Sequence, residues 1–78
     1  MSLEERITAL EADLDQAGLG GLGRHLEALE EKRALFHPEA LAYLERARGE
    51  WGMGQVEQVR NSLREVVDAY RRLHFGCP

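Results

Sequence analysis

The sequence predicts an all-α protein: a small antiparallel bundle of three to four helices with coiled-coil-like heptad seams. Three observations support this class. Apolar residues recur every three or four positions, no segment alternates apolar and polar residues as a strand would, and glycine or proline marks the breaks between helical segments. A chain of 78 residues is expected to form a single helical domain over residues 1–78.

The first helix is expected over residues 2–17. Ser2 and Glu5 have the spacing of a capping box, in which each side chain accepts a hydrogen bond from the other residue's backbone N–H. The apolar side chains follow 4-3-4-3 spacing, and such a narrow stripe is typical of a coiled-coil seam. They are Leu3, Ile7, Leu10, Leu14 and Ala17.

The glycine-rich stretch GLGGLG, residues 18–23, is expected to be a turn between the first two helices. Glycine-rich loops that bind phosphate follow a strand, and the Walker loop also needs a Lys before a Ser or Thr. Because neither feature accompanies this stretch, the sequence does not predict a phosphate site there.

The second helix is expected over about 22–36 and the third over about 38–48, unless the two form one kinked helix. Pro38 suits the first turn of a new helix, where its missing N–H costs nothing. Apolar residues on one side of each segment predict the inward faces. They are Leu22, Leu26, Leu29 and Phe36 in the second helix, and Ala40, Leu44 and Ala47, widened by Leu41 and Tyr43, in the third.

The fourth helix is expected over residues 55–74. It has the clearest apolar pattern and is longer than the second or the third helix. Seven apolar residues fall within about 120° of one another when projected at about 100° per residue. They are Val56, Val59, Leu63, Val66, Val67, Tyr70 and Leu73. Ser62 is expected on the polar side of this helix.

The stretch RGEWGMGQ, residues 48–55, places the one Trp of the chain among three glycines. Trp51 lies four residues after Ala47 and so continues the inner stripe of the third helix. We expect Trp51 to be buried and to close the end of the bundle, while the glycines turn the chain and Met53 fills the remaining gap. The alternative is that Trp51 and Met53 form an exposed anchor for a partner, since Trp and Met are enriched at interfaces.

Charge is distributed unevenly along the chain, whose net charge is −4. Residues 1–50 hold eleven acidic and six basic residues, whereas residues 51–78 hold three acidic residues and four arginines. Three arginines border the apolar stripe of the fourth helix, and three acidic residues form a flank on the first. They are Arg60, Arg64 and Arg71, and Glu4, Glu11 and Asp15. We expect these charges to pair, and we regard nucleic-acid binding as the less favoured use of the arginines.

No catalytic, cofactor or metal site is predicted. The soft metal ligands are His25, His37, His74 and Cys77, and no two histidines have the spacing that places both on one helical face. The carboxylates fall at outward positions, and Ser62 has no triad partners. We therefore expect a protein that is not an enzyme.

A cytoplasmic protein is expected, with no membrane segment. Apolar runs are far shorter than the ~20 residues that span a bilayer, and no signal peptide is recognisable. The chain has one cysteine, so an internal disulfide is impossible.

The segment FHPE, residues 36–39, and the later segment LREVVDAYRRL, residues 63–73, resemble the J domain of Hsp70 cochaperones. There an aromatic-His-Pro-Asp turn precedes a helix with a similar Tyr-containing stretch. This chain departs from the pattern because Glu39 replaces the Asp, an extra helix intervenes, and the helix before the turn is acidic. The resemblance implies a chaperone-associated factor as a minor alternative.

Taken together, these patterns favour a small helical module for protein–protein interaction, such as an adaptor, assembly factor or regulatory subunit, acting through its amphipathic helices. The alternative is a nucleic-acid-linked regulator, an antitoxin or small transcription factor, that uses the arginines of the fourth helix. A domain of this size has a thin stability margin, and its fourth helix is long. We therefore also expect a homodimer with the first and fourth helices at or beside the seam. The alternative is a monomeric bundle in which these two helices pack against each other within one chain.

Overall fold

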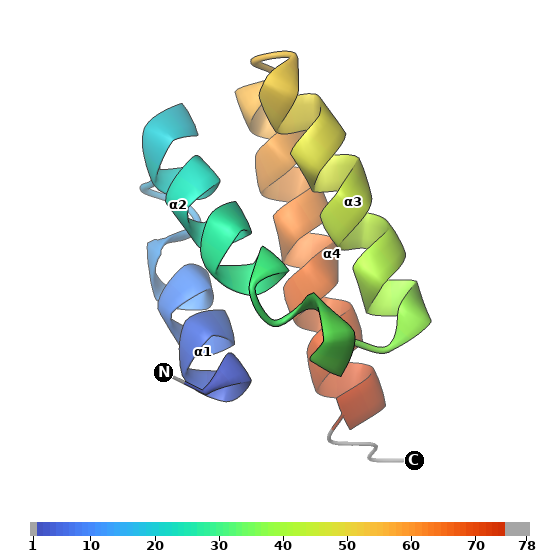
Figure 1. The fold of residues 1–78 in the computed structure, drawn as a ribbon. Helices are drawn as coiled ribbons and strands as arrows, with labels where there is room; N and C mark the ends of the chain where they lie inside the picture. Colours follow the sequence, from blue (N-terminus) through green and yellow to red (C-terminus); the bar gives the residue numbers. More distant parts are fainter. Residues whose placement is uncertain (1, 75–78) are drawn as a thin grey trace.

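The computed structural model describes residues 2–74, and within that range it contains helices and no strand (Figure 1). The elements are α1 (Leu3–Asp13), α2 (Leu19–Glu30), a short 3₁₀ helix η1 (Arg33–Leu35), α3 (Pro38–Gly52) and α4 (Val56–His74). The all-α prediction is confirmed. The alternative of one kinked helix in place of α2 and α3 is wrong, because η1 and two extended residues separate them.

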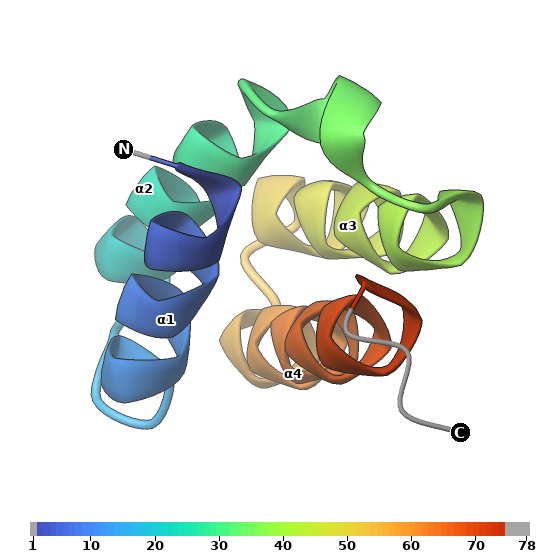
Figure 2. The same cartoon turned by 90° about the horizontal axis from the view of Figure 1, so that it is seen from below.

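The helices form two antiparallel pairs packed against each other. Figures 1 and 2 show the α1–α2 pair on one side of the α3–α4 pair, with the α3–α4 turn and the start of α2 at the same end. The closest association is between α3 and α4, and α1 contacts both α2 and α4. The bundle measures 35 × 22 × 21 Å. Both pairs therefore contribute to one core.

The predicted apolar stripes form that core. Every residue assigned to them is buried, except for four that are half-buried and pack against it. These four are Leu41, Tyr43, Val56 and Leu73. The 4-3-4-3 spacing on α1 and the matching pattern on α4 thus predicted which faces pack, because both follow the helical repeat.

The predictions for the starts of α1 and α3 are confirmed, and α3 has an additional side-chain cap. Ser2 Oγ accepts from the N–H of Glu5 at 3.2 Å, and the Glu5 carboxylate accepts from the N–H of Ser2 at 2.9 Å. At α3, Pro38 occupies the first turn and His37 Nδ1 accepts from the N–H of Glu39 at 3.2 Å. Both caps satisfy N–H groups that a helix start leaves without internal partners.

The predicted turn over residues 18–23 is wrong. The chain turns earlier, after α1 ends at Asp13, and α2 already begins at Leu19. Gly18 caps the start of α2, and Gly20, Gly21 and Gly23 lie within it. Two of these helical glycines lie against neighbours that leave little room for a side chain. A Cβ on Gly21 would lie 3.2 Å from the Cβ of Ala17, and one on Gly23 would meet the ring of Trp51. Glycine costs helix propensity but permits this close approach.

Two other boundaries differ from the predictions. The second helix ends at Glu30 rather than near Phe36, and η1 then redirects the chain so that Phe36 is still buried, with its ring centroid 6.3 Å from that of Tyr70. The third helix continues through Trp51 to Gly52. Of the three glycines near Trp51, Gly54 alone has a positive φ, 74°, and makes the turn.

Candidate functional site

Trp51 lies in the last turn of α3 and joins it to the first turn of α2. Its indole N–H donates to the carbonyl oxygen of Leu19 at 2.8 Å. The ring rests on Gly23, where a Cβ would come within 2.7 Å of the indole nitrogen. The side chain is half-buried against the core, so the prediction that Trp51 is buried is only partly correct. Trp51 therefore packs against the core at this end of the bundle, and part of it stays exposed.

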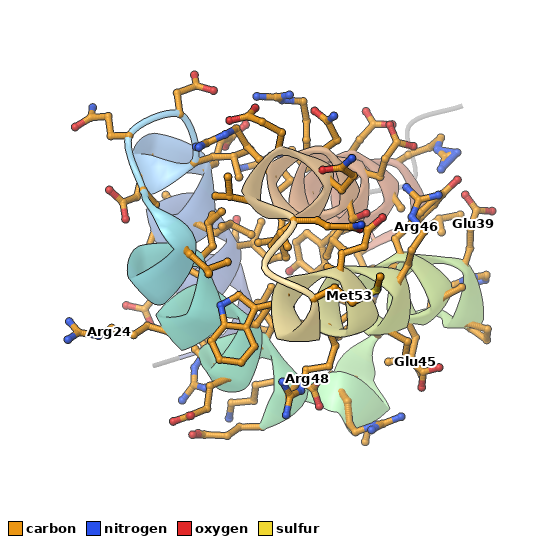
Figure 3. All side chains as sticks on the ribbon, turned by 90° about the horizontal axis from the view of Figure 1, so that it is seen from above. Arg24, Glu39, Glu45, Arg46, Arg48 and Met53 are labelled. Atoms are coloured by element: carbon orange, nitrogen blue, oxygen red, sulfur yellow. The ribbon has the colours of Figure 1, made fainter. Side chains whose placement is uncertain are left out.

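Met53 does not fill a gap, and that prediction is wrong. Because α3 continues to Gly52, Met53 becomes the residue that caps the helix, and 72% of it is exposed. Figure 3 looks down on this end and shows Met53 at the turn between α3 and α4. Leu19 is also exposed here, at the start of α2. We call Leu19, Trp51 and Met53 together the Trp51 end.

A hollow of about 220 Å³ adjoins the Trp51 end, between α2 and α3. It is lined by Gly23, Leu26, Glu27, Glu30, Arg48 and Trp51. The Arg48 guanidinium carbon lies 5.5 Å from the centroid of the Trp51 ring, within the range of a cation–π contact. Arg48 Nε is 3.8 Å from a carboxylate oxygen of Glu30, a loose ion pair. The hollow is smaller than typical ligand pockets, so its size suits one side chain rather than a cofactor.

Sequence reasoning missed the α2 side of this hollow. Gly23 is three residues before Leu26 and four after Leu19, so it falls on the inner side of α2, where a large apolar residue would be usual. That position was a recognisable signal of close packing by a bulky neighbour. Nothing in the spacing of Glu27 and Glu30 indicated that they would border Trp51.

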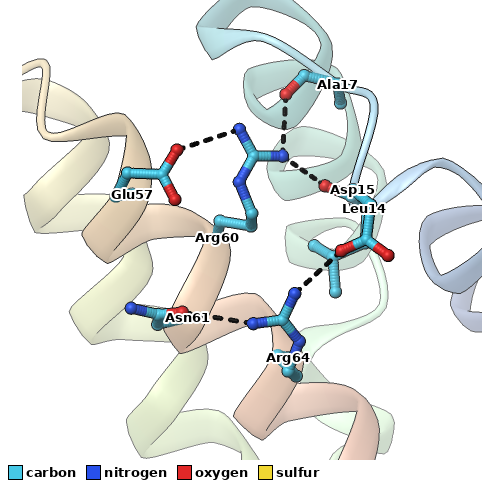
Figure 4. A network of polar contacts seen from close by, with 7 residues as sticks. All are labelled: Leu14, Asp15, Ala17, Glu57, Arg60, Asn61 and Arg64. Atoms are coloured by element: carbon cyan, nitrogen blue, oxygen red, sulfur yellow. Dashed lines mark hydrogen bonds and ion pairs between the residues drawn. The ribbon is translucent and has the colours of Figure 1, made fainter.

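Arg60 joins α4 to the end of α1. Its guanidinium donates to the carbonyl oxygens of Leu14 and Ala17 and lies 3.4 Å from the Glu57 carboxylate (Figure 4). Only 15% of the side chain is exposed. Carbonyls at a helix end lack internal partners, and a cation there also interacts favourably with the helix dipole. Arg60 thus donates hydrogen bonds to backbone carbonyl oxygens that follow the end of α1. The prediction that it pairs with an acidic residue of the first helix is wrong.

The other two arginines pair with the predicted acidic flank. A guanidinium nitrogen of Arg64 lies 2.9 Å from a carboxylate oxygen of Asp15, which follows α1. A guanidinium nitrogen of Arg71 lies 2.6 Å from a carboxylate oxygen of Glu11 in α1. Figure 4 shows Arg64 one turn beyond Arg60 on α4. The sixth member of the predicted set, Glu4, forms no ion pair with the described residues. Arg60, Arg64 and Arg71 therefore contact α1 or the segment after it within one chain, and phosphate contact would require them to leave these partners.

A buried polar contact that the sequence did not predict links α3 and α4. Ser62 is only 1% exposed, so its placement on the polar side of the helix was wrong. Its hydroxyl accepts from Arg46 Nε at 3.0 Å and donates to a Glu50 carboxylate oxygen at 2.5 Å. Serine is small enough for the close α3–α4 approach, and both of its hydrogen-bonding capacities are used. Ser62 is thus a structural contact, inaccessible to a substrate.

The histidines do not form a metal centre within residues 2–74, where no group of three or more candidate ligands comes together. His25 lies 3.0 Å from Asp13, while His74 Nε2 accepts from the backbone N–H of His37 at 3.3 Å. The ring of His74 also stacks on Tyr70, with centroids 4.6 Å apart. Cys77, considered above as a ligand, lies outside the described residues.

Burial raises the pKa of the Tyr70 hydroxyl above its ordinary value of 10.0, because the phenolate would lose its hydration. The negative charge of Glu4 adds to this effect, and Arg71 opposes it. At the surface, the pKa of the Glu5 carboxyl is lowered by the hydrogen bonds from the backbone and side chain of Ser2. Neither group adjoins the hollow beside Trp51, so neither suggests acid–base chemistry there.

No protein-family model matches the chain, and neither a curated protein nor a solved structure is significantly similar to it. The resemblance to J domains therefore depends on the short segments 36–39 and 63–73 alone. In the described part of the chain, no helix combines the length and apolar character needed to cross a bilayer.

Proposed function

We propose that this protein is a small, non-enzymatic protein-binding module and that it contacts its partner through the Trp51 end. The observation that carries the proposal is Met53, which is 72% exposed and lies two residues after a half-buried Trp51. Of the three large apolar residues exposed in the described chain, two, Leu19 and Met53, belong to this end; the third is Leu35. Grouped exposed apolar side chains are typical of interaction sites, and Trp and Met are enriched in them.

The proposal differs from the sequence-based one in the surface used. The amphipathic helices direct their apolar faces into the core of the same chain, so these faces are already occupied. The same argument applies to the expected homodimer, because α1 and α4 contact each other within one chain. Self-association stays a prediction, and a second copy is one of the partners that the Trp51 end could bind.

The nucleic-acid alternative is less well supported. Arg60, Arg64 and Arg71 all contact α1 or the segment after it. A phosphate backbone would have to displace the carbonyls or carboxylates that hold them, in a protein whose net charge is −4.

Affinity capture from an extract of the source cells tests the proposal. The wild-type chain is compared with Met53→Asp, which places a charge on the Trp51 end, and with Leu35→Asp, which places one on η1. Leu35 is also an exposed leucine, 56% exposed, and η1 lies at the other end of the bundle (Figure 1). We expect a partner that is retained by wild type and Leu35→Asp and lost with Met53→Asp. Equal recovery with all three chains, or no partner with any, would contradict the proposal.

A further inference from the structure

The hollow beside Trp51 combines an aromatic face with an excess of negative charge. Trp51 and the buried Leu26 supply apolar surface, while Glu27 and Glu30 supply two carboxylates against the single cation of Arg48. Glu27 forms no ion pair with the described residues, and Glu30 has only the long contacts to Arg33 at 4.0 Å and Arg48 at 3.8 Å. Both carboxylates therefore have capacity for a further cation.

Arg48 provides independent evidence that a guanidinium fits this place. Its guanidinium carbon lies over the Trp51 ring at 5.5 Å, yet its side chain is mostly exposed and its ion pair is loose. A cation held by one ring face and one distant carboxylate is easily exchanged for another, because exposed ion pairs contribute little. Arg48 thus shows which chemistry the ring accepts, without filling the hollow.

We propose that this hollow binds an arginine or lysine side chain of a basic segment in the partner protein, seated between the Trp51 ring and the carboxylates of Glu27 and Glu30. The inference rests on the proposed function and adds the chemistry of the partner. The volume of about 220 Å³ matches one inserted side chain. Leu19 accepts the hydrogen bond of the indole, and Met53 follows Trp51 by two residues at the same end of the bundle. Apolar residues of the partner segment beside the inserted cation would cover these two exposed side chains. The acidic net charge of this chain favours encounter with a basic segment.

A fluorescence titration tests the inference directly, because Trp51 is the single Trp of the chain and lies in the hollow. The probes are two synthetic peptides, acetyl-GRLRG-amide and acetyl-GELEG-amide, which differ only in the sign of their charged residues. We expect a saturable change in Trp51 emission with the arginine peptide and no saturable change with the glutamate peptide.

Three variants give the matched comparison. Glu27→Gln with Glu30→Gln should weaken binding of the arginine peptide by about fivefold or more. Glu4→Gln with Glu65→Gln changes the net charge equally at two exposed positions outside the hollow, and should weaken it by less than about twofold. Arg48→Gln removes the internal cation and should strengthen binding by about threefold.

The inference is overturned if the arginine peptide gives no saturable change, if the glutamate peptide binds as well, or if both double variants weaken binding equally. These results concern the carboxylates and the cation alone. The capture comparison depends on Met53, so a partner lost with Met53→Asp would uphold the proposed function even if the arginine peptide failed to bind.

Discussion

The indole of Trp51 rests on the backbone of Gly23, so that the end of α3 is held against the first turns of α2. A Cβ at residue 23 would approach the indole nitrogen and two ring carbons to 2.7–2.8 Å. Real side-chain contacts are not this short, and the ring is too rigid to yield by a small rotation. The absence of a side chain at residue 23 is therefore a condition for the position of Trp51.

Gly23→Ala is expected to destabilise the protein although alanine favours helices. Displacing the ring would break its hydrogen bond to Leu19 and disturb the packing of Leu26. We expect the free energy of unfolding to fall by about 1–2 kcal/mol after the gain in helix propensity of about 1 kcal/mol is included. Urea denaturation of the variant and of wild type, monitored by circular dichroism, measures this change in the free energy of unfolding.

Gly20→Ala is the control for this substitution, because Gly20 is in the same helix and a Cβ there would meet nothing within 4 Å. Its stability should be unchanged or higher, by up to about 1 kcal/mol. If Gly23→Ala were as stable as Gly20→Ala, the close contact between Trp51 and Gly23 would not exist in solution.

Arg60→Ala is expected to cost more stability than Arg64→Ala, although the two arginines are one turn apart on α4. Arg60 is 15% exposed and donates to carbonyls at the end of α1, which would lose their partner; we expect a loss of about 2 kcal/mol. Arg64 is 51% exposed and its partner Asp15 is 84% exposed, so its loss should cost less than about 1 kcal/mol. Denaturation curves for the two variants at one ionic strength make the comparison, and equal losses would contradict it.

Ser62→Ala is expected to lower the free energy of unfolding by about 1 kcal/mol. The substitution removes the contact between Arg46 and Glu50 that passes through the hydroxyl, but both of these side chains can still reach water. Glu65→Ala, at an exposed position on the same helix, should change stability by less than about 0.5 kcal/mol. A Ser62→Ala variant as stable as wild type would mean that the buried hydrogen bonds contribute nothing net.

Tyr70 is expected to ionise above its ordinary pKa of 10.0, because burial raises the pKa of its hydroxyl. The folded state therefore holds the proton more tightly than the unfolded state. This contribution to stability is fully present below pH 10 and is lost as the pH rises through the folded-state pKa. Ultraviolet absorbance titration of a Tyr43→Phe variant isolates Tyr70, and a midpoint at or below 10 would contradict the burial of its hydroxyl end.

The sequence predicted the helical faces well because burial repeats with the helical period. All five stripe residues predicted for the first helix are buried, although Leu14 and Ala17 lie beyond the end of α1, and so are the inner residues of α2. The sequence-based prediction failed at the glycines, because glycine occurs both in turns and at close contacts within helices. Gly20, Gly21 and Gly23 were interpreted as turn residues, but they lie in α2, and Gly23 accommodates a ring from α3. Such a contact joins residues 28 positions apart, and nothing local encodes it.

The candidate site was predicted in part. The charges of Arg64 and Arg71 and their acidic partners were identified from their positions on helical faces, since pairing between flanks follows from those positions. The prediction that Met53 fills a gap in the core was wrong, because the exposure of Met53 depends on where α3 ends. Four further helical residues, from Gly49 to Gly52, carried Met53 past the core. Helix ends are set by local competition between caps and tertiary contacts, which a periodic pattern does not record.

Site-specific photo-crosslinking in the source cells tests the central claim, that the Trp51 end meets a protein partner, most directly. A photoreactive phenylalanine derivative replaces Met53 in one chain and Leu35 in another. Both side chains are exposed, and the α3–α4 turn and η1, to which they belong, lie at opposite ends of the bundle. We predict a discrete crosslinked species of higher mass from position 53 and none from position 35. Crosslinking from position 35 alone, equal crosslinking from both positions, or none from either would contradict the claim.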